Sequence, residues 1–180
     1  MADGLRDPAQ ITRWIADVLA YGSARSDAVV LACALRPGAC HAALDDLTRA
    51  MAPSRERLIE TVDQGTAFAR TVSALTNRAL PPRALPVAVA EAASALTLPP
   101  DTVISIYLHS FAANLASIAT RYVPLGQTEG QQVLTVLHPT IAALAVWAAT
   151  ADITDLGSFS LGADIAAMRH ETLDVRLFKT

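Results

Sequence analysis

The stretch TVISIYLHSFAANLASIATRYVPLGQTEGQQVLTVLHPTIAALAVWAATA, from Thr102 to Ala151, decides the fold class. It carries only two formal charges, Arg121 and Glu129. Apolar residues recur at helical spacing on both sides of a short polar connection. We therefore expect two long helices, over about 102–122 and 129–149, with Pro139 kinking or breaking the second.

Each of these runs is long enough to cross a membrane, which takes about 20 apolar residues. However, the runs are rich in Ala, Ser, Thr, His, Gln and Asn, lack flanking Lys/Arg, and include Pro139. We favour two helices buried in protein, with a small helical membrane protein as the alternative. Helices that are apolar all round need cover on every side. Either another chain supplies part of it, as an oligomer or an obligate partner, or the other helices of one core cover both.

The rest of the chain also reads as helical. Asp7 should cap a helix that begins at Pro8 and ends at Gly22, and Ser54 and Asp101 should cap later ones. Further helices are expected over about 26–35, 40–51, 55–75, 87–96 and 163–171. Gly65 interrupts the fourth helix and indicates either close packing against a neighbouring backbone or a kink. No β alternation appears.

These patterns predict an all-α, single-domain helical bundle of about seven to eight helices spanning residues 1–180. Residues 1–167 would form the helical body and 168–180 a C-terminal tail. The tail, MRHETLDVRLFKT, keeps large apolar side chains among its charges. It should therefore dock, either on its own domain or in the groove of a partner.

Composition excludes several classes of protein. The net charge is −3 and no basic stripe occurs, which argues against a nucleic-acid partner. The polar, acidic start does not resemble a secretory signal, so we expect a cytoplasmic protein with reduced thiols. Cys33 and Cys40 lack zinc-type spacing, and buried structural thiols are the expectation for both.

No catalytic motif stands out. Gly126 and Gly130 have the wrong spacing for a phosphate loop and no lysine follows them. The histidines make no metal-binding pair along the chain, so each is expected to be a hydrogen-bonded core or interface residue. The acidic pairs are interpreted as capping or solvated. A helical enzyme with its site inside the bundle is the third class considered, and the low charge content argues against it. We predict no catalytic residue, no cofactor and no metal ligand. The histidines are His41, His109, His138 and His170, and the acidic pairs are Asp45-Asp46 and Asp152/Asp155.

The polar connection VPLGQTEGQQ, residues 123–132, is interpreted as a tight link between two helices. Pro124 would help to end the first helix, Gly126 would permit the turn, and Thr128 would cap the second. The amides of Gln127, Gln131 and Gln132 would satisfy backbone groups at the helix ends.

Two longer motifs resemble a known family. YLHSFAANLASIATRYVPLGQTEGQQVL, residues 107–134, and DLGSFSLGADIAAMRHETLDVRLF, residues 155–178, are similar to the signatures of the urease accessory protein UreF. SRERLIETVDQGTAFART, residues 54–71, also resembles the middle helix of that family. The resemblance covers nearly the whole chain.

The resemblance implies an all-α homodimer that is neither a hydrolase nor a GTPase. It implies an adaptor that joins the accessory protein UreD (UreH in some organisms) to the GTPase UreG during nickel insertion into apo-urease. The family's partner-docking tail would map to Arg169, His170, Glu171, Arg176, Leu177 and Phe178. The signature loop, with a structural or interface role, would map to Pro124, Leu125, Gly126, Gln127, Thr128, Gly130 and Gln131.

The chain departs from the family pattern in two places. Relatives usually begin with an Ala-Tyr-Ser-x-Gly-Leu-Glu segment before the helix that here contains Trp14, so we expect an N-terminally shortened member. Asp174 stands where relatives usually carry tyrosine, and an acid there should weaken an apolar docking contact. Another helical interaction scaffold is the remaining alternative.

Overall fold

The structure is a computed structural model that describes residues 7–122 and 125–157. Within these ranges the chain forms seven α-helices, one short 3-10 helix and no strand. The prediction of an all-α, single-domain bundle is therefore confirmed. The expected helix over 163–171 and the boundary before the tail lie outside the described residues. The elements are α1 (Pro8–Tyr21), α2 (Ser23–Ala34), α3 (His41–Ala50), α4 (Arg55–Thr76), α5 (Leu85–Ala93), α6 (Pro100–Tyr122), α7 (Gln127–Thr150) and η1 (Ile153–Asp155).

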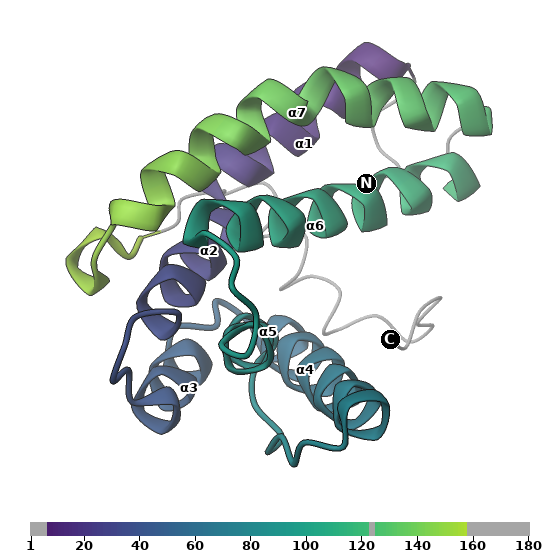
Figure 1. Ribbon diagram of the computed structural model, residues 1–180. Helices are drawn as coiled ribbons and strands as arrows, with labels where there is room; N and C mark the ends of the chain where they lie inside the picture. The colour runs from purple at the N-terminus through teal and green to yellow at the C-terminus, as the bar shows by residue number, and fades with distance from the viewer. Residues whose placement is uncertain (1–6, 123–124, 158–180) are drawn as a thin grey trace.

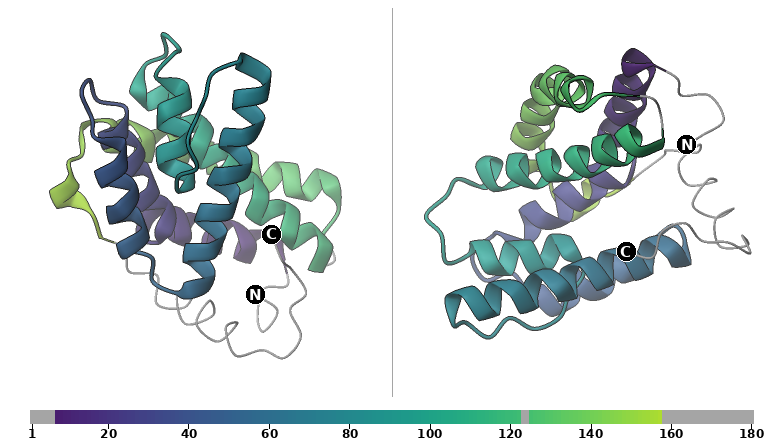
Figure 2. Two further views of the ribbon diagram at one scale, coloured as in Figure 1. Left: turned by 90° about the horizontal axis from the view of Figure 1, so that it is seen from below. Right: turned by 90° about the vertical axis from the view of Figure 1, so that its right-hand side faces the viewer.

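Helix α2 lies between two groups of helices (Figures 1 and 2). Helices α1, α6 and α7 form one group, and α3, α4 and α5 form the other. Helix α2 contacts α1, α3, α5, α6 and α7. All residues from 27 to 34 are buried, and most of them are Ala or Val, whose small side chains allow neighbouring helices to approach from several sides. The helix enclosed on all sides is thus α2, rather than either of the two long helices.

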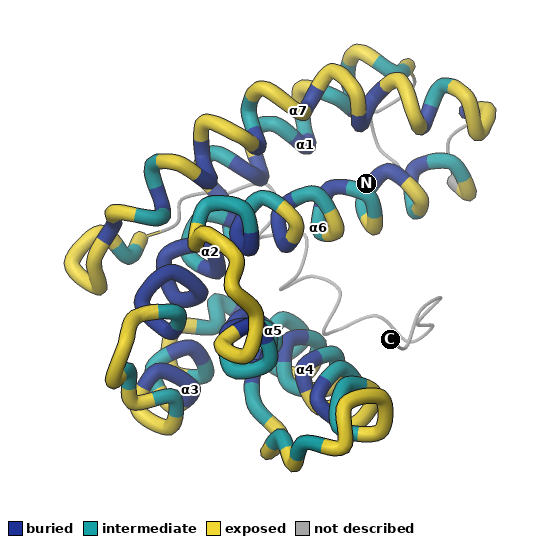
Figure 3. Tube along the Cα trace, in the orientation of Figure 1, coloured by how far each residue is buried: buried dark blue, intermediate teal, exposed yellow. Residues whose placement is uncertain are grey.

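Helices α6 and α7 pack against each other, and α1 covers part of α7. Their inner sides are fully buried at Ile104, Leu108 and Leu137, whereas Val136 and Val146 remain 64% and 61% exposed. Figure 3 shows the exposed positions along the outer side of α7. Among the described residues, the other helices therefore leave one side of each long helix uncovered. Because the expected helix over 163–171 lies outside the described residues, both expected arrangements, the single core and cover by another chain, stay predictions.

By length and composition, α6 and α7 are also the two helices of the described chain that are apolar enough to cross a membrane. Only 39% of the apolar window of each helix is buried. Core helices of globular proteins pass the same test, so this property alone does not distinguish the two classes.

Helix ends follow local capping chemistry, with a few corrections. The Asp7 carboxylate accepts a hydrogen bond from the Gln10 backbone N–H (2.8 Å), and Ser54 Oγ accepts one from the Arg57 backbone N–H (3.1 Å), as expected.

Asp101 is not a cap, because α6 begins at Pro100, where proline is well suited to the first helical turn. A kink or a break is expected at Pro139; the residue lies inside a continuous α7, so the break is wrong and the kink stays a prediction. Helix α2 begins earlier than expected, and α5 lies slightly toward the N-terminus of its expected range.

Gly65 of α4 permits a close contact with the segment that leads into α5. A Cβ atom at this position would clash with the Arg83 carbonyl oxygen and would lie 2.7 Å from the Leu85 backbone nitrogen. The segment is held there by two hydrogen bonds: Ala84 N–H donates to Asp45 Oδ1 (2.6 Å), and Leu85 N–H donates to Thr61 Oγ1 (3.3 Å). The close-packing interpretation of Gly65 is confirmed. Asp45 is buried rather than solvated, which corrects the expectation from sequence.

We predict that Gly65→Ala destabilises the fold by about 2–4 kcal/mol, because the clash is with backbone that cannot move independently. Gly157→Ala is the matched control, since a Cβ at Gly157 meets nothing within 4 Å. Urea denaturation of both variants measures the free energy of unfolding. Equal stabilities for the two variants would show that α4 and the 80–84 segment can separate without loss.

Candidate interaction site

The six residues predicted to bind a partner lie outside the described residues, so their role stays a prediction. They are Arg169, His170, Glu171, Arg176, Leu177 and Phe178.

The predicted signature loop turns out to be mainly the first turn of α7. Gly126 is the N-cap residue, and its N–H donates to the Glu129 carboxylate at 2.7 Å. Thr128 is therefore a residue of the helix and not its cap. The side chains of Gln127, Gln131 and Gln132 are exposed, so they do not satisfy helix ends in a dry interior as expected. Pro124 lies outside the described residues.

Two other residues of this loop fix how α6 and α7 approach each other. Leu125 is buried in the hydrophobic core. Gly130 is buried, and a Cβ there would lie 2.8 Å from the Thr120 methyl group. Because Gly130 has no side chain, α6 and α7 can pack closely at this end. This contact supports a structural role for the loop.

An open groove lies between α1, the start of α2 and α7. Tyr21, which is 62% exposed, Arg25 and Trp147 line it together with Pro139. The Arg25 guanidinium lies 3.5 Å from the centre of the Trp147 ring, a distance typical of a cation–π contact. Trp, Tyr and Arg are the residues most enriched among energetic hot spots of protein interfaces. The groove therefore has the chemistry of an interaction surface.

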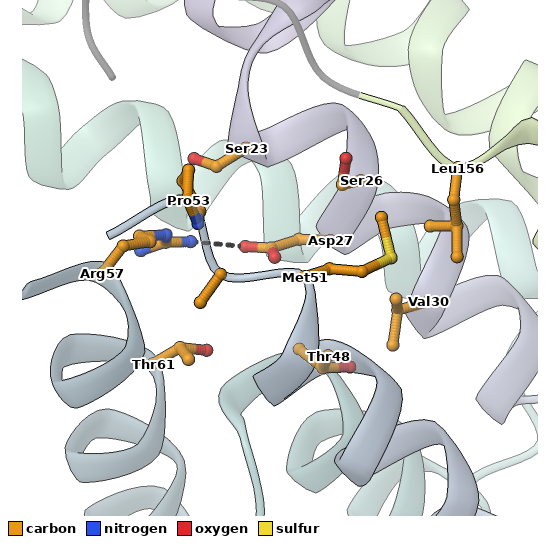
Figure 4. Close-up of a pocket in the computed structure, with 11 residues that line it drawn as sticks. Ser23, Ser26, Asp27, Val30, Thr48, Met51, Pro53, Arg57, Thr61 and Leu156 are labelled. Atoms are coloured by element: carbon orange, nitrogen blue, oxygen red, sulfur yellow. Dashed lines mark hydrogen bonds and ion pairs between the residues drawn. The ribbon is translucent and has the colours of Figure 1, made fainter. Parts of the chain in front are cut away.

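A buried polar network joins the two groups of helices. Asp27 of α2 accepts hydrogen bonds from Arg57 of α4 and from the Tyr107 hydroxyl of α6, each at 2.7 Å. Arg57 also pairs with Glu60 at 3.0 Å. Figure 4 shows the Arg57 side chain reaching across to Asp27. One carboxylate thus holds both neighbouring helices against α2.

The electrostatics of this network follow from its burial. Burial raises the pKa of Asp27, and the Arg57 guanidinium partly opposes this rise. The nearby Asp27 and Glu60 carboxylates raise the pKa of Arg57 despite its burial. Burial, reinforced by Asp27, raises the pKa of Tyr107 well above its usual value. Tyr107 is therefore held as a neutral donor, and Arg57 as a cation.

The cavity beside this network is too small for an enzyme substrate. Its volume is about 40 Å³, whereas small-molecule sites usually measure about 300–1,000 Å³. Ser26 Oγ is buried there without a hydrogen-bond partner among the described residues. The groups with shifted pKa values, Asp27, Arg57 and Tyr107, bond to one another. The arrangement therefore stabilises the structure and offers no free acid, base or nucleophile.

The two cysteines differ in their surroundings. Burial raises the pKa of the Cys33 thiol, as expected for a structural residue. Cys40, in contrast, is exposed, so the expectation of two buried thiols is wrong for this residue. Within residues 7–122 and 125–157, no group of three or more His, Cys, Asp and Glu side chains comes together as a metal cluster.

The comparisons with known proteins show the family. The family model named UreF matches residues 5–138. The chain belongs to the UreF family. This membership implies a role in urease maturation. The matched relatives are named as accessory proteins and not as enzymes.

The relatives match over nearly the whole chain. The chain is 58% identical over 176 residues to the urease accessory protein UreF of Cereibacter sphaeroides, covering 98% of this chain and 83% of that protein. It is 51% identical over 180 residues to that of Paracoccus denitrificans, covering 100% and 84%. The UreF of a Jannaschia species is 44% identical over 176 residues, covering 98% and 80%.

Sequence reasoning missed the two features that the UreF fold assembles from distant positions. Asp27, Arg57 and Tyr107 lie on three helices, and no local motif connects them. The available signal for the network was Asp27 itself, an acid within the apolar run of α2. A buried charge needs a partner, so this acid indicates a partner on another helix. Arg25 and Trp147 likewise meet only through the contacts of α2 with α7.

We predict that Asp27→Ala lowers the free energy of unfolding by roughly 2–4 kcal/mol, because the buried Arg57 cation keeps only Glu60 as a partner and the Tyr107 hydroxyl loses its acceptor. Asp152→Ala serves as the control, since its ion pair with Arg36 is exposed and should contribute little. Chemical denaturation compares the two variants. If both change stability equally, the buried network does not hold the helices together.

We also predict that Tyr107→Phe removes a stability loss at high pH. The folded-state pKa of Tyr107 is raised above its usual value near 10, so above pH 10 the unfolded chain releases a proton that the folded chain keeps. Stability therefore falls as pH rises there, by up to about 1.4 kcal/mol per pH unit.

Denaturation between pH 9 and 11 measures this slope, which should be shallower for Tyr107→Phe. Tyr21→Phe changes an exposed ring and should keep the wild-type slope. The same slope in all three proteins would contradict the assignment to Tyr107.

Proposed function

We propose that this chain is a cytoplasmic, homodimeric adaptor of urease maturation. It bridges the accessory protein UreD (UreH in some organisms) and the GTPase UreG during GTP-dependent nickel insertion into apo-urease. The observation that carries this proposal is the UreF match, at 58% identity over 98% of the chain. The protein acts by binding other proteins and not by catalysis.

Three structural observations support an adaptor. The outer sides of α6 and α7 expose apolar residues that another chain can cover, among them Ile106, Val136 and Val146. The groove beside Trp147 offers aromatic and cationic contacts. The cavity beside Asp27 is too small for a substrate. Together these favour interfaces over an active site in the described part of the chain.

We assign the UreD contact to the C-terminal tail, on the resemblance of its motif. In this proposal the apolar side chains of Leu177 and Phe178 enter a groove of the partner, and the arginines anchor the edge of the contact. Asp174 weakens the contact relative to family members that carry tyrosine there. The remaining residues of the contact are Arg169, His170, Glu171 and Arg176.

Co-expression with UreD and UreG tests the proposal. We expect the wild-type chain to co-purify with both proteins and to restore urease activity in a strain that lacks its own UreF. Arg176→Ala should weaken co-purification with UreD by about tenfold or more while leaving the melting temperature nearly unchanged, because an anchor at an interface contributes to binding and not to the core.

Arg70→Ala is a control for the loss of one arginine, because Arg70 is an exposed residue of α4. It should leave both binding and melting temperature unchanged. Equal loss of melting temperature and binding in Arg176→Ala would show that the tail is part of the chain's own core. Failure of the wild-type chain to co-purify with either partner would remove the adaptor role.

A membrane protein is the second candidate, because α6 and α7 are long and apolar enough to span a bilayer. Fractionation with a carbonate wash separates the two classes. The adaptor predicts recovery in the supernatant, whereas membrane-spanning helices predict retention in the pellet.

A further inference from the structure

The groove between α1, the start of α2 and α7 is mainly apolar and open to solvent. Its volume is about 550 Å³, and every side chain that lines it apart from Arg25 is uncharged. Small-molecule sites have similar volumes, but they usually bury most of their ligand. Helices α1 and α7 lie side by side here (Figures 1 and 2), and an open groove along two helices suits a segment of another protein that covers it.

Arg25 brings an unpaired positive charge into this groove. Its guanidinium lies over the Trp147 ring, 3.5 Å from the ring centre. Within residues 7–122 and 125–157, no ion pair and no side-chain hydrogen bond engages this guanidinium. Stacking uses the flat face of the group, so the N–H donors along its edge remain available. A carboxylate supplies both the acceptor atoms and the negative charge that these donors lack.

The acids closest to this groove in the described part of the chain do not supply that carboxylate. Asp27 is bonded within the buried network. Asp152, which follows the end of α7, pairs with Arg36 at 3.3 Å. Asp17 of α1 is exposed and does not line the groove. The missing negative charge therefore has to come from another molecule.

The start of α2 also favours a negatively charged group at this place. Helix α2 begins at Ser23, and its N-cap residue Gly22 provides no side-chain cap. The N–H groups of a first helical turn carry partial positive charge. Tyr21 and Arg25 flank this turn and both line the groove. The helix dipole and the guanidinium therefore attract the same kind of ligand.

We propose that this groove binds a segment of a partner protein in which an Asp or Glu lies beside large apolar side chains. The carboxylate pairs with Arg25, and the apolar side chains cover Trp147 and the exposed ring of Tyr21. Aromatic and arginine side chains of this kind are typical anchors of protein interfaces. The inference rests on the proposed adaptor function, and it gives UreD or UreG a contact on the helical body in addition to the C-terminal tail.

Peptide binding tests the groove directly. Overlapping peptides that tile the UreD and UreG sequences are the probe, and the full chain carries Trp14→Phe, so that Trp147 is its one remaining tryptophan. We expect a peptide with an Asp or Glu among apolar residues to shift the Trp147 emission to the blue, because apolar side chains cover the ring. Replacing that acid by Asn or Gln should weaken binding by about tenfold or more, and so should Arg25→Gln.

Exchange of the charges separates a lost contact from a lost fold. Arg25→Glu should reject the original peptide and bind a peptide whose acid is replaced by Lys, which a misfolded chain would not do. Arg70→Glu is the matched control, because Arg70 is exposed on α4 in the other group of helices. It should bind the original peptide as the wild type does.

Several results would overturn the proposal. These are the absence of any peptide that shifts the Trp147 emission, equal binding of the Asn or Gln peptide, and unchanged binding of the original peptide to Arg25→Glu. A change of the Trp147 emission on dilution without peptide would also overturn it, because a second copy of the chain would then cover the groove.

Co-purification distinguishes this inference from the adaptor function on which it rests. We expect Arg25→Glu to weaken co-purification with UreD or with UreG by about tenfold or more. If the wild type and Arg25→Glu retain both partners equally, the groove is not a docking site and the adaptor function stands. If the wild type retains neither partner, the adaptor function fails, whereas the peptide measurements still decide what the groove binds.

Discussion

The placement of the two helix groups against α2 depends on the hydrogen bonds of one buried carboxylate, that of Asp27. It lies on the most enclosed helix and accepts hydrogen bonds from Arg57 and Tyr107, at 2.7 Å each. Removing a charge from water is costly unless it is paired and hydrogen-bonded. Because Asp27 needs both partners, α4 and α6 are fixed relative to α2. The network thus gives the bundle specificity in a core where small apolar side chains provide few directional contacts.

The distribution of apolar residues links this architecture to an interaction role. Helix α2, which is short, is enclosed by its neighbours, whereas α6 and α7 are long and leave one side uncovered. The core is therefore built around α2, and apolar surface remains on the outside of the two long helices. Exposed apolar surface of this kind is typical of interaction sites, which agrees with a family of accessory proteins.

Two glycines allow close contacts between neighbouring segments of the bundle. Gly65 lets the backbone that precedes α5 lie against α4, and Gly130 lets α7 lie against Thr120 of α6. At the start of α7, the Gly126 N–H donates to the Glu129 carboxylate. The same α6–α7 contact brings the rings of His109 and His138 together, with their centres 5.5 Å apart.

The sequence by itself determined the helical class, the caps at Asp7 and Ser54, the close packing at Gly65 and the family, because each depends on residues near one another in the chain. It placed caps wrongly at Asp101 and Thr128, since proline or glycine with a nearby acid can start a helix equally well. Only the tertiary structure decided that α2 is the enclosed helix, that Asp27 joins Arg57 and Tyr107, and that the two histidines meet. These depend on which helix faces touch, and side-chain spacing along one helix does not specify the partner of each face.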